Sequence, residues 1–148
     1  MALARRLLLE SRAPLGWARI ALPARLVAGA IFLGFSIGKF TRHGAESAAL
    51  ERYGLPFPNE FTYAVGIVEL VGGAMLVLGP GTRIAALALA FDMVGAITTA
   101  GRVEGGFVHP GVAPLLLAAM LLILWVGPGR RSLDCRLLAR GSGECLTD

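Results

Sequence analysis

Charged side chains and cysteines are scarce in this sequence of 148 residues. Only 16% of the residues are Asp, Glu, Lys or Arg, whereas a soluble domain usually carries about 25%. The chain has two cysteines and two histidines, and it contains no Gly-rich phosphate loop, no nuclease-like acidic cluster and no Cys-x-x-Cys pair. The sequence therefore lacks the patterns that identify common classes of soluble enzyme.

Long apolar runs are the dominant feature of the chain. Four of them are each about long enough to form a helix that crosses a bilayer: 22–40, 61–78, 83–100 and 107–126. The net charge of +4 is then expected to mark the cytoplasmic flanks of membrane helices, and not a surface for nucleic acid. We predict an all-α integral membrane four-helix bundle, with one domain over residues 1–134 and a cytoplasmic tail over 135–148.

The segments between these runs predict smaller elements. Residues 1–19 carry arginines and leucines at helical spacing, which indicates a short interfacial helix that ends near Pro14, with Trp17 at the headgroup level. In the segment 41–60, residues 45–53 predict two helical turns before a Pro-rich exit, and this segment is expected to form a lid on the outer face. The sequence Gly-Pro-Gly-Thr at 79–82 predicts a tight turn between antiparallel helices, with Thr82 as the N-cap.

The distribution of cationic residues predicts the orientation of the chain. If the N-terminus is inside, the inner segments hold Arg5, Arg6, Arg12, Arg19, Arg83, Arg130, Arg131, Arg136 and Arg140. The outer segments hold the smaller set of Lys39, Arg42, Arg52 and Arg102. Because positive charge accumulates on the cytoplasmic side, both termini are expected in the cytoplasm and the protein in the inner (plasma) membrane.

Ionisable residues inside the apolar runs are the candidate functional residues. Arg25 and Lys39 share one face of the first run, and Glu69 and Asp92 lie near the middle of the second and third. One interpretation is an Arg25–Glu69 ion pair that fixes helix order, with Asp92 protonated or hydrogen-bonded. The other is a polar pocket that binds a ligand headgroup or relays protons. Close helix packing is expected at Gly34, Gly38, Gly66 and Gly73.

The cysteines and histidines lie outside the apolar runs or at their edges. Nine residues separate Cys135 from Cys145 in the tail, where a redox-active thiol is one interpretation and two inert cysteines the other. No metal site is expected, although His43 and His109 on the same membrane face, with Glu46 or Glu104, form an alternative.

Six short motifs occur in an order that resembles the DoxX family of small membrane proteins. They are Gly34-x-x-x-Gly38-Lys39, Gly54-Leu55-Pro56, Glu69-Leu70-x-Gly72-Gly73, Leu78-Gly79, Thr82-Arg83 and Gly127-Pro128-Gly129-Arg130-x-Ser132-Leu133-Asp134. The resemblance covers residues 25–134 and implies a four-helix membrane bundle. Polar positions of the family pattern match Arg25, Lys39, Glu69 and Arg83, whereas Asp92 and the tail cysteines depart from it.

The family is named for the small subunit of a thiosulfate:quinone oxidoreductase, so the resemblance implies a subunit of a quinone-linked redox complex. In this hypothesis the chain holds no cofactor alone, its partners are other subunits of the complex, and a quinone is the ligand. Arg25 and Lys39 would bind the headgroup, and Glu69 or Asp92 would supply or accept a proton. The alternatives are a non-catalytic anchor or assembly subunit and a carrier of a small lipid-like ligand.

Overall fold

The computed structural model describes residues 15–103 and 111–127, and every regular element in these ranges is helical. The main helices are α2 (Leu15–Thr41), α3 (His43–Arg52), α4 (Pro58–Leu78), α5 (Thr82–Thr98), α6 (Ala100–Val103) and α7 (Ala113–Val126). The segments Ile20–Thr41, Pro58–Leu78 and Thr82–Val103 are long and apolar enough to cross a membrane, and α7 is a shorter apolar helix. The all-α prediction is confirmed for the described residues.

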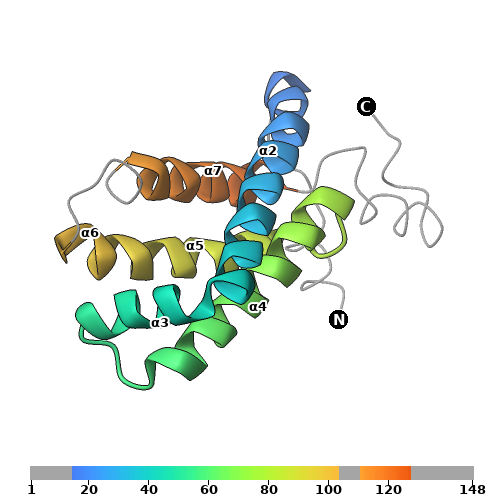
Figure 1. Cartoon of the computed structure of the whole chain (residues 1–148). Coiled ribbons are helices and arrows are strands. Elements are labelled where there is room, and N and C mark those ends of the chain that lie inside the picture. Colours follow the sequence, from blue (N-terminus) through green and yellow to red (C-terminus); the bar gives the residue numbers. More distant parts are fainter. Residues whose placement is uncertain (1–14, 104–110, 128–148) are drawn as a thin grey trace, which may run out of the picture.

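The helices α2, α4, α5 and α7 pack in a ring around one apolar core. α2 contacts α4 most extensively and also α7, while α5 contacts α7 and α4, so each of these helices has two neighbours (Figure 1). The centre holds fully buried side chains from every one of them: Phe32, Leu76, Leu89, Met120 and Ile123. α3 packs on α4 at one end of the ring.

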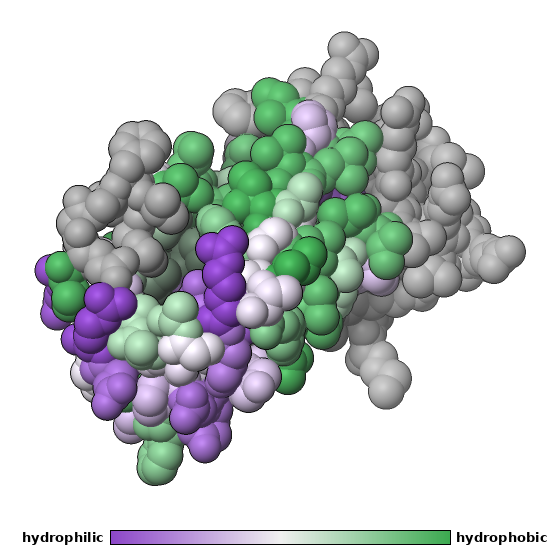
Figure 2. Space-filling view, in the orientation of Figure 1, coloured by the Kyte–Doolittle hydropathy of each residue, from purple (hydrophilic) through white to green (hydrophobic). Residues whose placement is uncertain are grey.

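The outside of the ring is apolar as well. Large exposed side chains occur on α2, α4, α5 and α7, and they include Val27, Ile67, Leu87, Phe91 and Leu115. Figure 2 shows hydrophobic residues over the helices and hydrophilic residues gathered at the end where α3 lies. A helix that is apolar on all sides is suited to a bilayer, in which lipid covers the outer face.

Glycines allow α2 and α4 to approach closely at one crossing. A Cβ atom added to Gly29 would lie 2.9 Å from the carbonyl oxygen of Gly73, and one added to Gly73 would lie 3.0 Å from that of Gly29. Gly66 also packs closely, against Phe40. The prediction of close packing at Gly34 and Gly38 is wrong, because nothing lies within 4 Å of a Cβ added at either position. At about 100° per residue, these two glycines lie on the side of α2 opposite Gly29.

The turn between α4 and α5 confirms the predicted antiparallel connection, but its capping differs. Gly79 and Gly81 have φ angles of 91° and 59°, the left-handed conformation that glycine adopts most easily. Gly81 is the N-cap of α5, so the prediction of Thr82 at this position is wrong. Thr82 is the first helical residue, and its hydroxyl group donates a hydrogen bond to the carbonyl oxygen of Gly79 at 3.1 Å.

The boundaries of the remaining elements agree in part with the predictions. α3 coincides closely with the helical turns predicted over 45–53. α2 begins at Leu15 and continues through Pro23, so the helix extends further toward the N-terminus than the predicted span 22–40. The predicted interfacial helix before Pro14, residues 107–110 of the predicted fourth span, and the tail lie outside the described residues.

Candidate functional site

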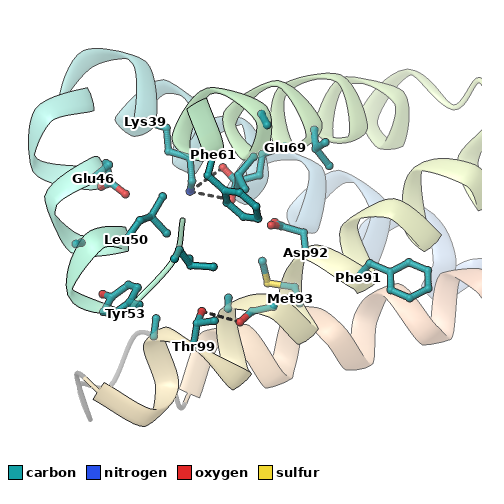
Figure 3. Close-up of a pocket in the computed structure, with 18 of the residues that line it drawn as sticks. Lys39, Glu46, Leu50, Tyr53, Phe61, Glu69, Phe91, Asp92, Met93 and Thr99 are labelled. Carbon is teal, nitrogen blue, oxygen red and sulfur yellow. Dashed lines mark hydrogen bonds and ion pairs between the residues drawn. The ribbon is translucent and has the colours of Figure 1, made fainter. Parts of the chain in front are cut away.

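A pocket of about 630 Å³ lies between α3, α4 and α5, and ligand sites typically occupy about 300–1,000 Å³. Its walls are mostly apolar and include Leu50, Val65 and Met93. Four Lys, Glu or Asp side chains also line it: Lys39, Glu46, Glu69 and Asp92 (Figure 3). The pocket therefore has the composition of a ligand site, in which a few polar groups converge among apolar walls.

The pocket lies beyond a point of close contact between α4 and α5. About two helical turns from the turn that joins them, Gly72 packs against Leu89, and a Cβ atom added to Gly72 would lie 2.9 Å from Cγ of Leu89. Further from the turn, side chains of both helices line the pocket, and Leu50 of α3 and Tyr53 line its other end (Figure 3). The site is thus a wedge between two helices, with its narrow end at Gly72 and Leu89.

Lys39 and Glu69 form the ion pair of this site. Nζ of Lys39 donates a hydrogen bond to Oε1 of Glu69 at 3.0 Å and lies 3.0 Å from Oε2 as well. The Glu69 side chain is 3% exposed and that of Lys39 is 17% exposed. Oε2 is buried without a hydrogen bond of its own among the described residues, so its contact with Nζ is ionic.

Asp92 faces this ion pair from α5. Figure 3 shows its carboxyl group directed into the pocket near Lys39 and Glu69. It is close enough to interact electrostatically with both of them. Its Oδ2 atom is buried and has no hydrogen-bond partner in the described part of the chain. With one ammonium group and two carboxyl groups, the centre of the pocket either carries net negative charge or binds a proton.

Arg25 lies outside this pocket, and the predicted Arg25–Glu69 ion pair is wrong. The guanidinium group donates from Nε and Nη2 to the carbonyl oxygen of Leu76, at 3.1 and 3.0 Å. Leu76 is seven residues, or roughly 10 Å along the helix axis, from Glu69. Arg25 thus binds a carbonyl group in the last turn of α4, where backbone acceptors lack partners within the helix. Lys39, at the other end of α2, supplies the cation for Glu69 instead.

The structure brings three of the predicted site residues together, namely Lys39, Glu69 and Asp92. It adds Glu46 and Tyr53, which the sequence analysis did not place in the pocket. The predicted helix over 45–53 was the signal that could have found them, because a short helix between two spans packs against the ends of those spans. Arg83, a polar match to the family pattern, is 9% exposed and does not line the pocket.

The alternative metal site receives no support from the described residues. His43 stacks on Tyr63 with ring centroids 4.0 Å apart. Within residues 15–103 and 111–127, no three His, Cys, Asp or Glu side chains are grouped to hold a metal ion. Its other predicted members, His109 and Glu104, lie outside these ranges, as do Cys135 and Cys145.

These features define a helical membrane protein with several apolar helices and a polar pocket between them. The chain belongs to the DoxX family, whose family model matches residues 20–102.

The chain is similar in sequence to two bacterial proteins. An uncharacterized membrane protein of Mycobacterium tuberculosis, Rv3486, is 38% identical over 132 residues, which cover 80% of this chain and 81% of the relative. A Bacillus subtilis protein named "Putative oxidoreductase CatD" is 31% identical over 75 residues, which cover 51% of this chain and 54% of that protein. No solved structure matches the chain.

Proposed function

We propose that the protein is a membrane subunit of a quinone-linked redox complex, and that the pocket between α3, α4 and α5 binds the quinone headgroup. The observation that carries this proposal is the convergence of Lys39, Glu69 and Asp92 in one pocket of about 630 Å³ with apolar walls. Support also comes from the similarity to a relative named as an oxidoreductase, over about half of each chain.

Each polar side chain has a separate role in this proposal. Lys39 has three N–H donors, so it can bind a carbonyl oxygen of the headgroup while it remains paired with Glu69. Oδ2 of Asp92 lacks a partner within the described structure and would accept a hydrogen bond from a hydroxyl group of the reduced headgroup. Arg25 has no role at the headgroup, because it binds the Leu76 carbonyl group.

The carboxyl groups would handle the protons of the reaction. Reduction of a quinone to a hydroquinone takes up two electrons and two protons, and the reverse reaction releases them. In this proposal a redox centre in a partner subunit exchanges the electrons. Glu69 and Asp92 hold and transfer the protons, because both lie at the pocket and Asp92 faces Glu69.

We also propose a membrane arrangement for this subunit. α7 belongs to a fourth span, α3 covers the pocket on the outer face, and both termini lie in the cytoplasm of a cell with the protein in its plasma membrane. The placement of α3 against α4, at the hydrophilic end of the molecule, supports its role as a cover (Figure 2).

Quinone reduction by membranes that contain the protein and its co-purifying partner tests the proposed function. We expect Glu69→Gln and Asp92→Asn each to lower turnover at least tenfold, because each removes a proton-exchanging group. Glu60→Gln is the matched control, since Glu60 is an exposed residue of α4 that does not line the pocket. Unchanged turnover and quinone affinity in both pocket variants would contradict the proposal and favour an anchor or assembly subunit.

A further inference from the structure

The rim of the pocket is formed by apolar side chains on the outer surface of α4 and α5. Phe61 and Val68 on α4 are 43% and 39% exposed, and Phe91 on α5 is 70% exposed, although all three line the pocket. Residues that line a pocket and are also exposed mark the place where it opens. This opening therefore lies along the seam between α4 and α5.

The seam faces the part of the molecule that lipid is expected to cover. Both helices belong to segments long and apolar enough to cross a membrane. Val68 and Phe91 lie near the middle of these segments, at the depth of the hydrocarbon. The opening is consequently directed into the bilayer and not toward water at this depth.

The other sides of the pocket are occupied by protein. Contact between Gly72 and Leu89 closes the narrow end of the wedge. α3 lines the opposite end with Ala49 and Leu50, and Lys39 of α2 lies at the back. The structure thus favours entry from the side over entry along the axis of the ring.

The same pairing of side chains occurs on both walls of the seam. Val68 directly precedes Glu69, and Phe91 directly precedes Asp92. Because neighbouring residues differ by about 100° around a helix, each apolar side chain lies at the surface while the acid beside it lies in the pocket. Figure 3 shows Phe91 directed away from the pocket and Asp92 directed into it. A polar ligand group bound at Glu69 and Asp92 is therefore adjacent to residues that lie on the lipid-facing surface of the two helices.

We infer that the pocket takes its ligand sideways from the bilayer through the seam between α4 and α5, and that this ligand is a quinone with a long apolar tail. The headgroup lies at Lys39, Glu69 and Asp92, and the tail passes between Val68 and Phe91 into the lipid. This inference rests on the proposed function and adds the route and the class of quinone. A quinone without a tail is held less strongly in lipid and gains less from an opening at hydrocarbon depth, because fewer of its CH₂ groups leave water.

Photo-crosslinking in lipid nanodiscs tests the inference with the full chain. The probe is a long-tailed benzoquinone that carries a diazirine on the tail, close to the ring. We expect mass spectrometry to find cross-links at residues 61–68 and 88–95, and we expect an excess of unlabelled long-tailed quinone to compete for them. Cross-links that this excess does not reduce would indicate contact with the surrounding lipid shell only, and would overturn the inference.

Two tryptophan substitutions provide a matched pair for a binding measurement. Ala88 is exposed and lines the pocket, whereas its neighbour Leu87 is 49% exposed and does not line it. We expect Ala88→Trp to weaken binding of the long-tailed quinone at least tenfold and Leu87→Trp to leave it unchanged. Equal affinity in both variants would overturn the side entry. If Ala88→Trp does not fold, cross-linking of the unaltered chain decides the question.

The outcomes separate this inference from the proposed function. Competed cross-links confined to residues 46–55, with binding that depends on Glu69, would show a quinone pocket that is entered past α3. The proposed function would then stand and the side entry would fail. Absence of saturable binding for both the long-tailed quinone and its tailless counterpart would remove the proposed function, and the inference with it.

Discussion

Lys39 and Glu69 are thirty positions apart in the sequence, yet Nζ of the one lies 3.0 Å from both carboxylate oxygens of the other. The pair connects the end of α2 to the middle of α4 at the wall of the pocket. An unpaired charge at this depth would be costly, so the ion pair also allows each charged group to be retained in an apolar surrounding. The same two side chains thus stabilise the fold and supply a polar wall of the site.

The first prediction concerns the strength of this pair. Lys39→Met leaves a buried carboxyl group without its cation, and we expect the free energy of unfolding in detergent to fall by about 3 kcal/mol. Adding Glu69→Leu should recover a large part of this loss, because no unpaired charge then remains. Glu60→Gln, at an exposed position of α4, serves as the control and should change little. Losses that simply add in the double variant would show that the two residues are not coupled.

The second prediction separates Arg25 from the pocket. Because Arg25 binds the Leu76 carbonyl group while Glu69 binds Lys39, Arg25→Met and Glu69→Gln should act independently on stability. We expect their effects on the unfolding free energy to add within about 0.5 kcal/mol. Thermal unfolding of the two single variants and the double variant measures this. A coupling above 1 kcal/mol, on the order seen for residues in direct contact, would contradict the assignment of partners.

The third prediction compares two glycines of α2. Gly29→Ala places a Cβ atom 2.9 Å from the Gly73 carbonyl oxygen, and relief of this contact requires the backbones to move apart. We expect a loss of about 2 kcal/mol, as is typical for overpacking. Gly34→Ala adds a methyl group in open space and should be neutral or stabilising by up to about 1 kcal/mol, since alanine favours the helix. The opposite order of stabilities would contradict the crossing between α2 and α4.

The fourth prediction tests the orientation in the membrane. With both termini in the cytoplasm, Cys135 and Cys145 should resist a membrane-impermeant maleimide in intact cells and react after lysis. A positive control uses Glu51, an exposed residue of α3. Glu51→Cys, in a chain that carries Cys135→Ser and Cys145→Ser, should react in intact cells because the proposed topology places α3 on the outer face. Rapid labelling of the tail cysteines before lysis would reverse the proposed topology.

Helix positions were predictable because they depend on local properties of the chain. The apolar run 61–78 and the breaker residues at 79–81 are enough to locate α4 and its antiparallel partner α5, and the structure moves their ends by only a few residues. Two buried acids could also be expected to face protein, because lipid solvates a carboxylate poorly. Glu69 and Asp92 accordingly lie at one pocket.

The partners of these residues could not be predicted, because they depend on how far one helix is shifted along its neighbour. The periodicity of α2 places Arg25 and Lys39 on one face but does not say which of them lies level with Glu69. In the structure this stagger places Arg25 at Leu76 and Lys39 at Glu69. The same limit explains the error at Gly34, because a glycine pattern indicates that close packing is sterically allowed but does not identify the helix face that packs.

The contact between Gly29 and Gly73 helps to determine which cationic side chain pairs with Glu69. Where two backbones touch, no flexible side chain can absorb a shift, so this crossing sets the register of α2 along α4. A slip of one residue would move Lys39 by about 1.5 Å along the axis and rotate it by about 100° away from Glu69. Two residues without functional groups therefore determine the electrostatics of a site that lies about one turn away along α4 and almost three turns away along α2. A methyl group added at either glycine would alter the charge pairing as well as the packing.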